Sequence, residues 1–172
     1  MDETIKLLVE KFDRYNFLTN MLPGAVLCMA LEHFVGYKLL ESNEWMLSVI
    51  LFYFVGIVNN RFGSLVVESS LKRLTIFKFE PYEDYIKAEK IDKKIDVLNA
   101  DNNSFRSYIS VFLLSLLAFI FKTVTNYFPA VKEIEGFILI FSLLILFICA
   151  YHKQTESLRK RIKVALKNSR SI

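Results

Sequence analysis

The chain has 172 residues, of which 53% are hydrophobic and 15% aromatic, and its net charge is +4. A soluble domain carries about 45–50% apolar residues even when Gly is counted, so this composition excludes a mainly disordered chain and is typical of a membrane protein. Two cysteines exclude a disulfide scaffold, and two distant histidines, His33 and His152, offer no zinc site. We therefore predict an all-α integral membrane protein.

The N-terminal segment, residues 1–20, is expected to form an amphipathic cytoplasmic helix. It lies on the inner membrane surface or packs on a partner subunit. Asn20 and Pro23 predict a break in the chain, after which a new helix begins. The apolar residues that recur at helical spacing are Ile5, Leu8, Val9, Phe12 and Tyr15.

Four apolar stretches approach the roughly 20 residues that a helix needs to cross a bilayer. They predict two transmembrane hairpins, one within residues 21–66 and one within residues 106–152. The first stretch contains charged residues, so a re-entrant or interfacial helix is the alternative for it. The expected spans cover residues 22–40, 45–65, 108–127 and 134–151.

Glu32 and His33 lie near the middle of the first expected span. A charged side chain there costs about 2.5–3.5 kcal/mol on insertion scales, so it needs a physical reason. Asn20, Cys28, Glu32 and Gly36 fall on roughly one face of a helix. We interpret this face as the lining of a pore or cavity. The alternatives are that Glu32 bonds a group in another span or that the span lies shallow.

Asn59, Asn60 and Arg61 interrupt the second expected span. The 14 residues before them make a helix of about 21 Å, which is shorter than the roughly 30 Å hydrocarbon core. Arg61 could extend to the headgroups, but two adjacent amides need hydrogen-bond partners. The triplet predicts a gate or an inter-subunit network at the inner mouth of a pore; bonds to a neighbouring helix are the alternative.

Residues 67–105 are predicted to form a cytoplasmic linker subdomain between the hairpins. Residues 74–80 alternate and are rich in aromatics, which predicts a short strand. Pro81 then opens a helix that is expected to run to about Asn99 and to end at residues 101–103. The last segment, residues 153–172, is predicted to be a separate basic amphipathic helix.

The basic residues at the inner side are candidates for binding an anionic ligand such as a nucleotide or a short single-stranded DNA. Retention of positive charge in the cytoplasm and attraction to anionic lipid are the competing explanation. The candidate ligand-binding residues are Arg61, Lys72, Arg73, Arg159, Lys160, Arg161 and Lys163.

Lys and Arg also predict the orientation. Of the 22 in the chain, 19 lie in segments that would be on one side and only Lys38, Lys122 and Lys132 on the other. The positive-inside rule therefore places both termini in the cytoplasm. No catalytic motif occurs, so we expect no enzymatic activity, no cofactor and no metal.

The four spans, the turn at residues 59–64, the segment at residues 81–103 and the basic end together resemble small membrane effectors of bacterial anti-phage defence. The chain is most similar to the channel-forming effector of the Hailong system. This resemblance implies a homotetrameric pore that a short DNA oligomer, made by a partner nucleotidyltransferase, holds closed. Loss of the oligomer would depolarise the cell and abort the infection. The membrane subunit of the Kiwa system, a tetrameric sensor with a DNA-binding partner, is the second resemblance.

The sequence thus predicts an oligomeric pore with its first span nearest the axis. A non-conducting sensor or scaffold subunit that recruits a cytosolic DNA-binding partner is the alternative. A lipid-handling or transport protein is a third class.

Overall fold

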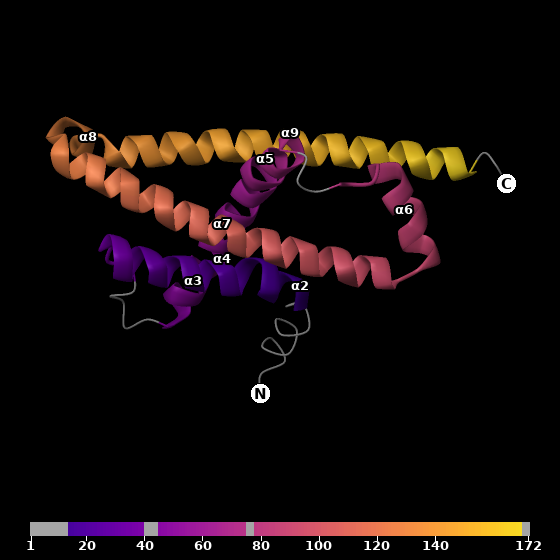
Figure 1. The fold of residues 1–172 in the computed structure, drawn as a ribbon, viewed down its shortest axis with the longest axis horizontal. Coiled ribbons are helices and arrows are strands. Elements are labelled where there is room, and N and C mark those ends of the chain that lie inside the picture. Colours follow the sequence, from indigo (N-terminus) through magenta and orange to yellow (C-terminus); the bar gives the residue numbers. More distant parts are fainter. Residues whose placement is uncertain (1–13, 40–44, 75–77, 170–172) are drawn as a thin grey trace.

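The computed structural model describes residues 14–39, 45–74 and 78–169, and every regular element in that part is helical (Figure 1). Four helical rods are long and apolar enough to cross a membrane. The predicted all-α, four-span class is therefore confirmed. Of the amphipathic helix predicted over residues 1–20, residues 1–13 lie outside the described part, and residues 14–20 are helical and continue into the first rod. The four rods are Phe17–Val35, Trp45–Arg73, Lys94–Tyr127 and Glu135–Lys167.

The first rod is continuous, so the predicted break between Asn20 and Pro23 is wrong. Leu22 keeps right-handed helical geometry, and its N–H donates to the carbonyl of Phe17 in a widened π-helical turn. Pro23 then falls in the first turn of the next α-helix, where a missing N–H is tolerated. The rod ends at Gly36, whose positive φ of 78° gives a left-handed cap. Its elements are α2 (Arg14–Asn16), η1 (Phe17–Met21), α3 (Leu22–Ala30) and η2 (Leu31–Val35).

The second rod also runs without a break, through α4 (Trp45–Phe62), the π-helical η3 (Gly63–Val67) and α5 (Glu68–Arg73). It therefore continues well beyond the apolar stretch. Of the predicted strand at residues 74–80, residues 75–77 lie outside the described part, and the remaining residues form no strand.

The linker helix differs from its predicted form. It is α6 (Tyr82–Ile91), and it ends at Asp92, whose backbone is extended. The Asp92 carboxylate accepts a hydrogen bond of 2.9 Å from the N–H of Lys94 and so starts a second helix, α7 (Lys94–Tyr127). Residues 101–103 lie inside α7. The helix end predicted at residues 101–103 is wrong, because the backbone hydrogen bonds of the helix that starts after Asp92 continue through these residues.

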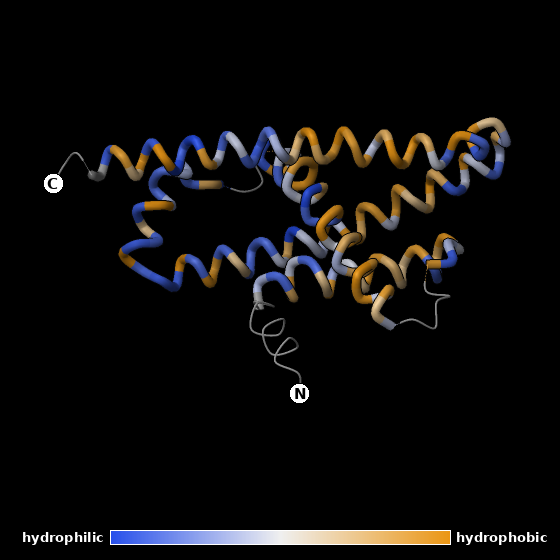
Figure 2. The backbone as a smooth tube through the Cα atoms, turned by 180° about the vertical axis from the view of Figure 1, so that it is seen from behind, coloured by the Kyte–Doolittle hydropathy of each residue, from blue (hydrophilic) through white to orange (hydrophobic). Residues whose placement is uncertain are grey.

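The fourth span and the predicted C-terminal helix are one rod. A short α8 (Pro129–Glu133) leads into α9 (Glu135–Ser169), 35 residues without interruption. The half of α9 next to α8 is hydrophobic and the other half is hydrophilic (Figure 2). Positions 66, 105 and 152, where segment boundaries were predicted, all lie within continuous helices.

The first three spans pack tightly through small residues. A Cβ on Gly24 would lie 2.7 Å from the amide nitrogen of Gly56. A Cβ on Gly63 would lie 3.2 Å from the Cβ of Ser110. Close backbone approach through small residues is a common way for membrane helices to associate. By contrast, α9 leaves most of its apolar half exposed, and α6 runs between the N-terminal end of α7 and the hydrophilic half of α9 (Figure 1).

Candidate functional site

A chain of polar contacts joins all four rods at the level where the apolar half of α9 ends. The cluster begins with Asn59, which is fully buried. Its side-chain amide donates to the carbonyl of Ser107 in α7 at 3.0 Å, while the hydroxyl of Ser110 donates to the Asn59 carbonyl at 2.9 Å. The Ser107 hydroxyl in turn donates to the carbonyl of Thr19 at 3.0 Å. Asn59 therefore fastens the first three spans to one another inside one chain.

Asn60 extends the cluster toward charged residues. Its amide nitrogen donates to Oδ1 of Asn20 at 2.8 Å, and its own Oδ1 accepts a bond of 3.0 Å from the Arg106 guanidinium. Asn20 also donates to Asn16 at 3.1 Å. Both members of the Asn pair thus bond neighbouring helices, which is the alternative that the sequence left open. These polar contacts lie at one level of otherwise apolar helices, and we take this level as one boundary of the apolar part of the bundle.

Glu68 is the centre of the charged part of the cluster. Its carboxylate accepts from Lys72 at 2.6 Å, from Arg106 at 3.0 Å and from Lys153 at 3.2 Å. Lys153 also donates to the carbonyl and the hydroxyl of Ser64 at 2.7 and 2.8 Å. One negative charge therefore meets three positive charges, and the site is short of anions.

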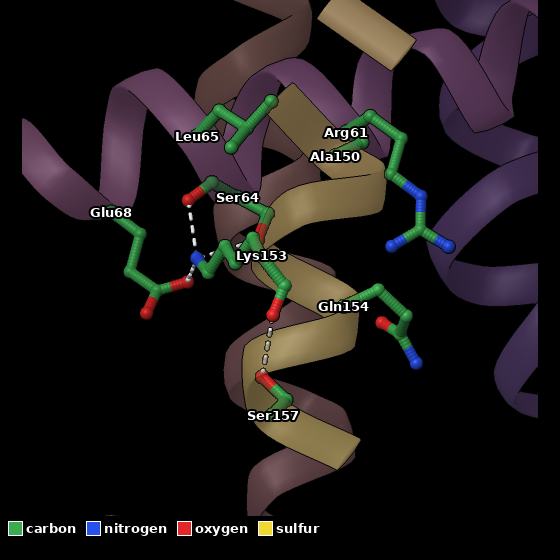
Figure 3. Close-up of a pocket in the computed structure, with 8 residues that line it drawn as sticks. All are labelled: Arg61, Ser64, Leu65, Glu68, Ala150, Lys153, Gln154 and Ser157. Atoms are coloured by element: carbon green, nitrogen blue, oxygen red, sulfur yellow. Dashed lines mark hydrogen bonds and ion pairs between the residues drawn. The ribbon is translucent and has the colours of Figure 1, made fainter. Parts of the chain in front are cut away.

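A pocket of about 130 Å³ opens beside Lys153, between the second rod and α9 (Figure 3). The Arg61 side chain lies at its edge, on the same side of α9 as the Gln154 amide and opposite Glu68. Arg61 makes no hydrogen bond or ion pair with another described residue. The lining residues are Arg61, Ser64, Leu65, Glu68, Ala150, Lys153, Gln154 and Ser157.

The polar stripe of the first span faces its own subunit. Asn20 and Cys28 are buried, and Cys28 has no exposed surface. The buried Oε2 of Glu32 has no hydrogen-bond partner among the described residues. Asn20 and Cys28 therefore pack against other spans of the same chain, whereas Glu32 is half-buried and Gly36 is exposed.

His33 lies on a different side of the first span from Glu32. It is exposed and lines an apolar groove of about 630 Å³ between the first span and α7. Its ring meets Phe34 edge-on with centroids 4.8 Å apart. Glu32 and His33 both belong to η2, whereas Asn20 at that boundary belongs to η1, about 18 Å away along the helix. The structure does not bring the two residues together with Asn59, Asn60 and Arg61.

The predicted ligand-binding residues divide into two groups. Arg61 and Lys72 lie at the cluster, while Arg73 is exposed at the end of α5. On α9, Arg159 pairs with Glu156 at 3.3 Å, and Arg161 lies 3.7 Å from Glu89 of α6. Lys160 and Lys163 are exposed on the same helix. Exposed positive charge therefore continues from the pocket along the hydrophilic half of α9.

At the other end of the bundle, Tyr37 ties the first span to the start of α9. Its hydroxyl donates to Glu135 at 2.7 Å, and Lys122 lies 4.9 Å above its ring. Burial and the bond to Glu135 raise the pKa of Tyr37 to about 12, so it stays protonated at neutral pH.

Three residues of the charged cluster were not among the predicted site residues: Glu68, Arg106 and Lys153. They are far apart in the sequence, but each is a charged residue close to the inner end of its apolar run. Glu68 is also the sole acid of the second rod. Charges at equal depth on neighbouring spans are natural partners, and that pattern could have indicated the cluster.

Comparison with known protein families, curated proteins and solved structures finds no match to this chain. The assignment that the structure supports directly is therefore a small multi-span helical membrane protein. Anything finer depends on the chemistry of the cluster.

Proposed function

We propose that this chain is the subunit of an oligomeric membrane pore, an effector of bacterial anti-phage defence that a cytoplasmic anionic ligand holds closed. The ligand class is a nucleotide or short single-stranded DNA, supplied by a partner such as a nucleotidyltransferase. Its release opens the pore and depolarises the inner membrane. Both termini lie in the cytoplasm in this proposal.

The observation that carries the proposal is the excess of positive charge where all four rods meet. Glu68 balances one of the three cations that bond it, and Arg61 adds another positive charge beside them. The basic half of α9 extends this field into the cytoplasm. A ligand bound here contacts the second and fourth spans at once, which is what a gating ligand must do to favour one arrangement of them.

The conducting path in this proposal lies between subunits. Thr19, Asn20 and Cys28 of the first span are buried, and the Ser107 hydroxyl of the third span bonds the Thr19 carbonyl, so a single copy offers these residues no aqueous path. The exposed apolar sides of α7 and α9 provide area for contacts with further copies. A closed ring gives every copy the same contacts, and we propose a tetramer.

A non-conducting sensor or scaffold subunit is the second candidate. It is favoured by the burial of Asn20 and Cys28 within one subunit. Because these polar groups already pack against their own chain, they do not need a pore axis to keep them away from lipid. In this case the basic half of α9 would recruit a cytosolic DNA-binding partner, and expression of the chain would cause no leakage.

The test measures potassium leakage and membrane potential in cells that express the chain with and without its neighbouring genes. We expect leakage from the chain alone, suppression by the ligand-producing partner, and weakened suppression in the double variant Arg159→Ala with Arg161→Ala. The matched control is Lys90→Ala with Lys93→Ala, which removes two exposed charges from α6 and the turn after it. No leakage in any background would exclude the pore and leave the scaffold.

A further inference from the structure

We propose that the pocket beside Arg61 is a binding site for a single phosphate group, held by the Arg61 guanidinium with help from the Gln154 amide. This inference deepens the proposed function and rests on it for its regulatory meaning. The binding itself is a separate claim about these residues.

The first step concerns which cation is available. A lysine ammonium has three donors. Those of Lys153 are directed to the carbonyl of Ser64, the hydroxyl of Ser64 and the carboxylate of Glu68, at 2.7, 2.8 and 3.2 Å. All three donors of Lys153 are therefore used within the protein, and its side chain lines the pocket in a fixed position. Arg61 lies at the same pocket with five donors and no partner among the described residues.

The second step concerns the shape and charge of the ligand. A guanidinium presents two parallel N–H donors that match two oxygens of a phosphate or carboxylate. Figure 3 shows the Gln154 amide below the Arg61 fork, away from the Glu68 carboxylate, so an anion between them avoids that negative charge. The pocket volume of about 130 Å³ suits a small group rather than a whole nucleobase stack. These features favour one phosphate.

The third step concerns depth. The apolar half of α9 ends at Tyr151, two residues before Lys153, so the pocket lies where lipid headgroups begin. Basic pockets between spans on the cytoplasmic side bind phospholipid headgroups. The same chemistry also accepts a phosphate ester from the cytosol. The two sources share the phosphate and are separated by experiment.

The consequence concerns the joint between the second rod and α9. The pocket is bounded by Ser64 and Glu68 from one side and by Lys153 from the other, so the Lys153 bonds hold the two rods together across it. A phosphate on Arg61 and Gln154 adds a second link between the same rods. We expect the occupied pocket to make this joint more resistant to separation.

The experiment uses the full chain in nanodiscs and records the midpoint of thermal unfolding. In one arm, phosphatidylcholine discs receive increasing phosphatidic acid; in the other, discs of phosphatidylcholine alone receive inorganic phosphate or a nucleoside monophosphate in solution. Stabilisation in the first arm identifies the lipid as the source, and stabilisation in the second identifies a soluble phosphate. If neither raises the midpoint of the wild type, the site does not exist.

Arg61→Gln should weaken the response about tenfold, since charge-assisted bonds are the strong ones. Lys90→Gln, which removes one exposed charge on α6, should leave it unchanged. Arg61→Lys keeps the charge but loses the fork, so it should bind more weakly than wild type, and this comparison carries the test if Arg61→Gln does not fold. Equal binding by wild type and Arg61→Lys would overturn the bidentate site.

The two proposals fail separately. Loss of phosphate binding in these assays, with regulated leakage intact in cells, overturns the phosphate site alone. Phosphate binding without leakage in any background overturns the pore and leaves the site.

Discussion

At the scale of single residues, the Glu68 carboxylate is the one acid that the side chains of Lys72, Arg106 and Lys153 share among the described residues. Its side chain is only 17% exposed, so water screens these contacts poorly. Removal of one partner from a buried ion pair leaves the others unpaired in a medium of low polarity. Loss of Glu68 therefore affects more contacts than loss of any one cation, because Glu68 is the acid in all three ion pairs.

We expect Glu68→Gln, which preserves the size of the side chain, to destabilise the protein by up to about 3 kcal/mol, the lower end of the range for a broken buried pair. Thermal unfolding in nanodiscs measures it. Glu83→Gln, an exposed acid on α6, is the control and should behave as wild type. An unchanged midpoint for Glu68→Gln would mean that the cations are held by other groups.

At the scale of elements, the contact between the first and second spans is made by backbone. A Cβ on Gly24 or on Gly56 would lie well inside contact distance of the opposite main chain, so neither helix can accept a larger residue without moving away. The Asn20–Asn60 bond lies close to this crossing and depends on the same approach. The close packing of Gly24 on Gly56 and the Asn20–Asn60 hydrogen bond therefore depend on each other.

Gly56→Ala should therefore cost about 1–3 kcal/mol of stability, the usual range for overpacking, and should loosen the Asn20–Asn60 bond. The measurement is the unfolding midpoint together with the rate of modification of Cys28, which is buried in the same contact. Gly136→Ala is the matched control, because a Cβ there meets nothing within 4 Å. Faster modification of Cys28 in the Gly136 variant would argue against a local effect.

The sequence predicted the spans well because long apolar runs have few alternatives to a membrane helix. It predicted the helix ends poorly. Residues 101–103 have the composition of a helix end, and Pro23 that of a helix start, but both lie in continuous rods. Local preferences of this kind are weak, and here an Asp92 cap and a π-helical turn override them.

The candidate site was predicted in part for a similar reason. Asn59, Asn60 and Arg61 stand out because they are polar neighbours within an apolar run. The partners of Glu68 on other rods lie 38 and 85 residues away, and a pairing of that kind depends on how the rods pack. The direction of the polar stripe in the first span likewise depends on the Gly24–Gly56 contact, which composition does not reveal.

At the scale of the whole molecule, α2 and the hydrophilic end of α9 lie toward the same side of the apolar half of α9 (Figure 1). The charge distribution predicts that this side is the cytoplasm. In a chain with Cys149→Ser, a cysteine introduced at position 43 or 130 should react with a membrane-impermeant maleimide added to intact cells. A cysteine at position 90 should stay protected. Reaction at 90 with protection at 43 and 130 would reverse the orientation.

Because α9 is one uninterrupted helix, it can move as a rigid body. The three bonds of Lys153 hold it at a point about 27 Å from Glu135 and about 21 Å from Lys167. A rigid rod that turns about such a point moves its two ends in opposite directions by similar distances. A displacement of the basic half of α9 therefore moves its opposite end, where Glu135 accepts the hydrogen bond from the Tyr37 hydroxyl.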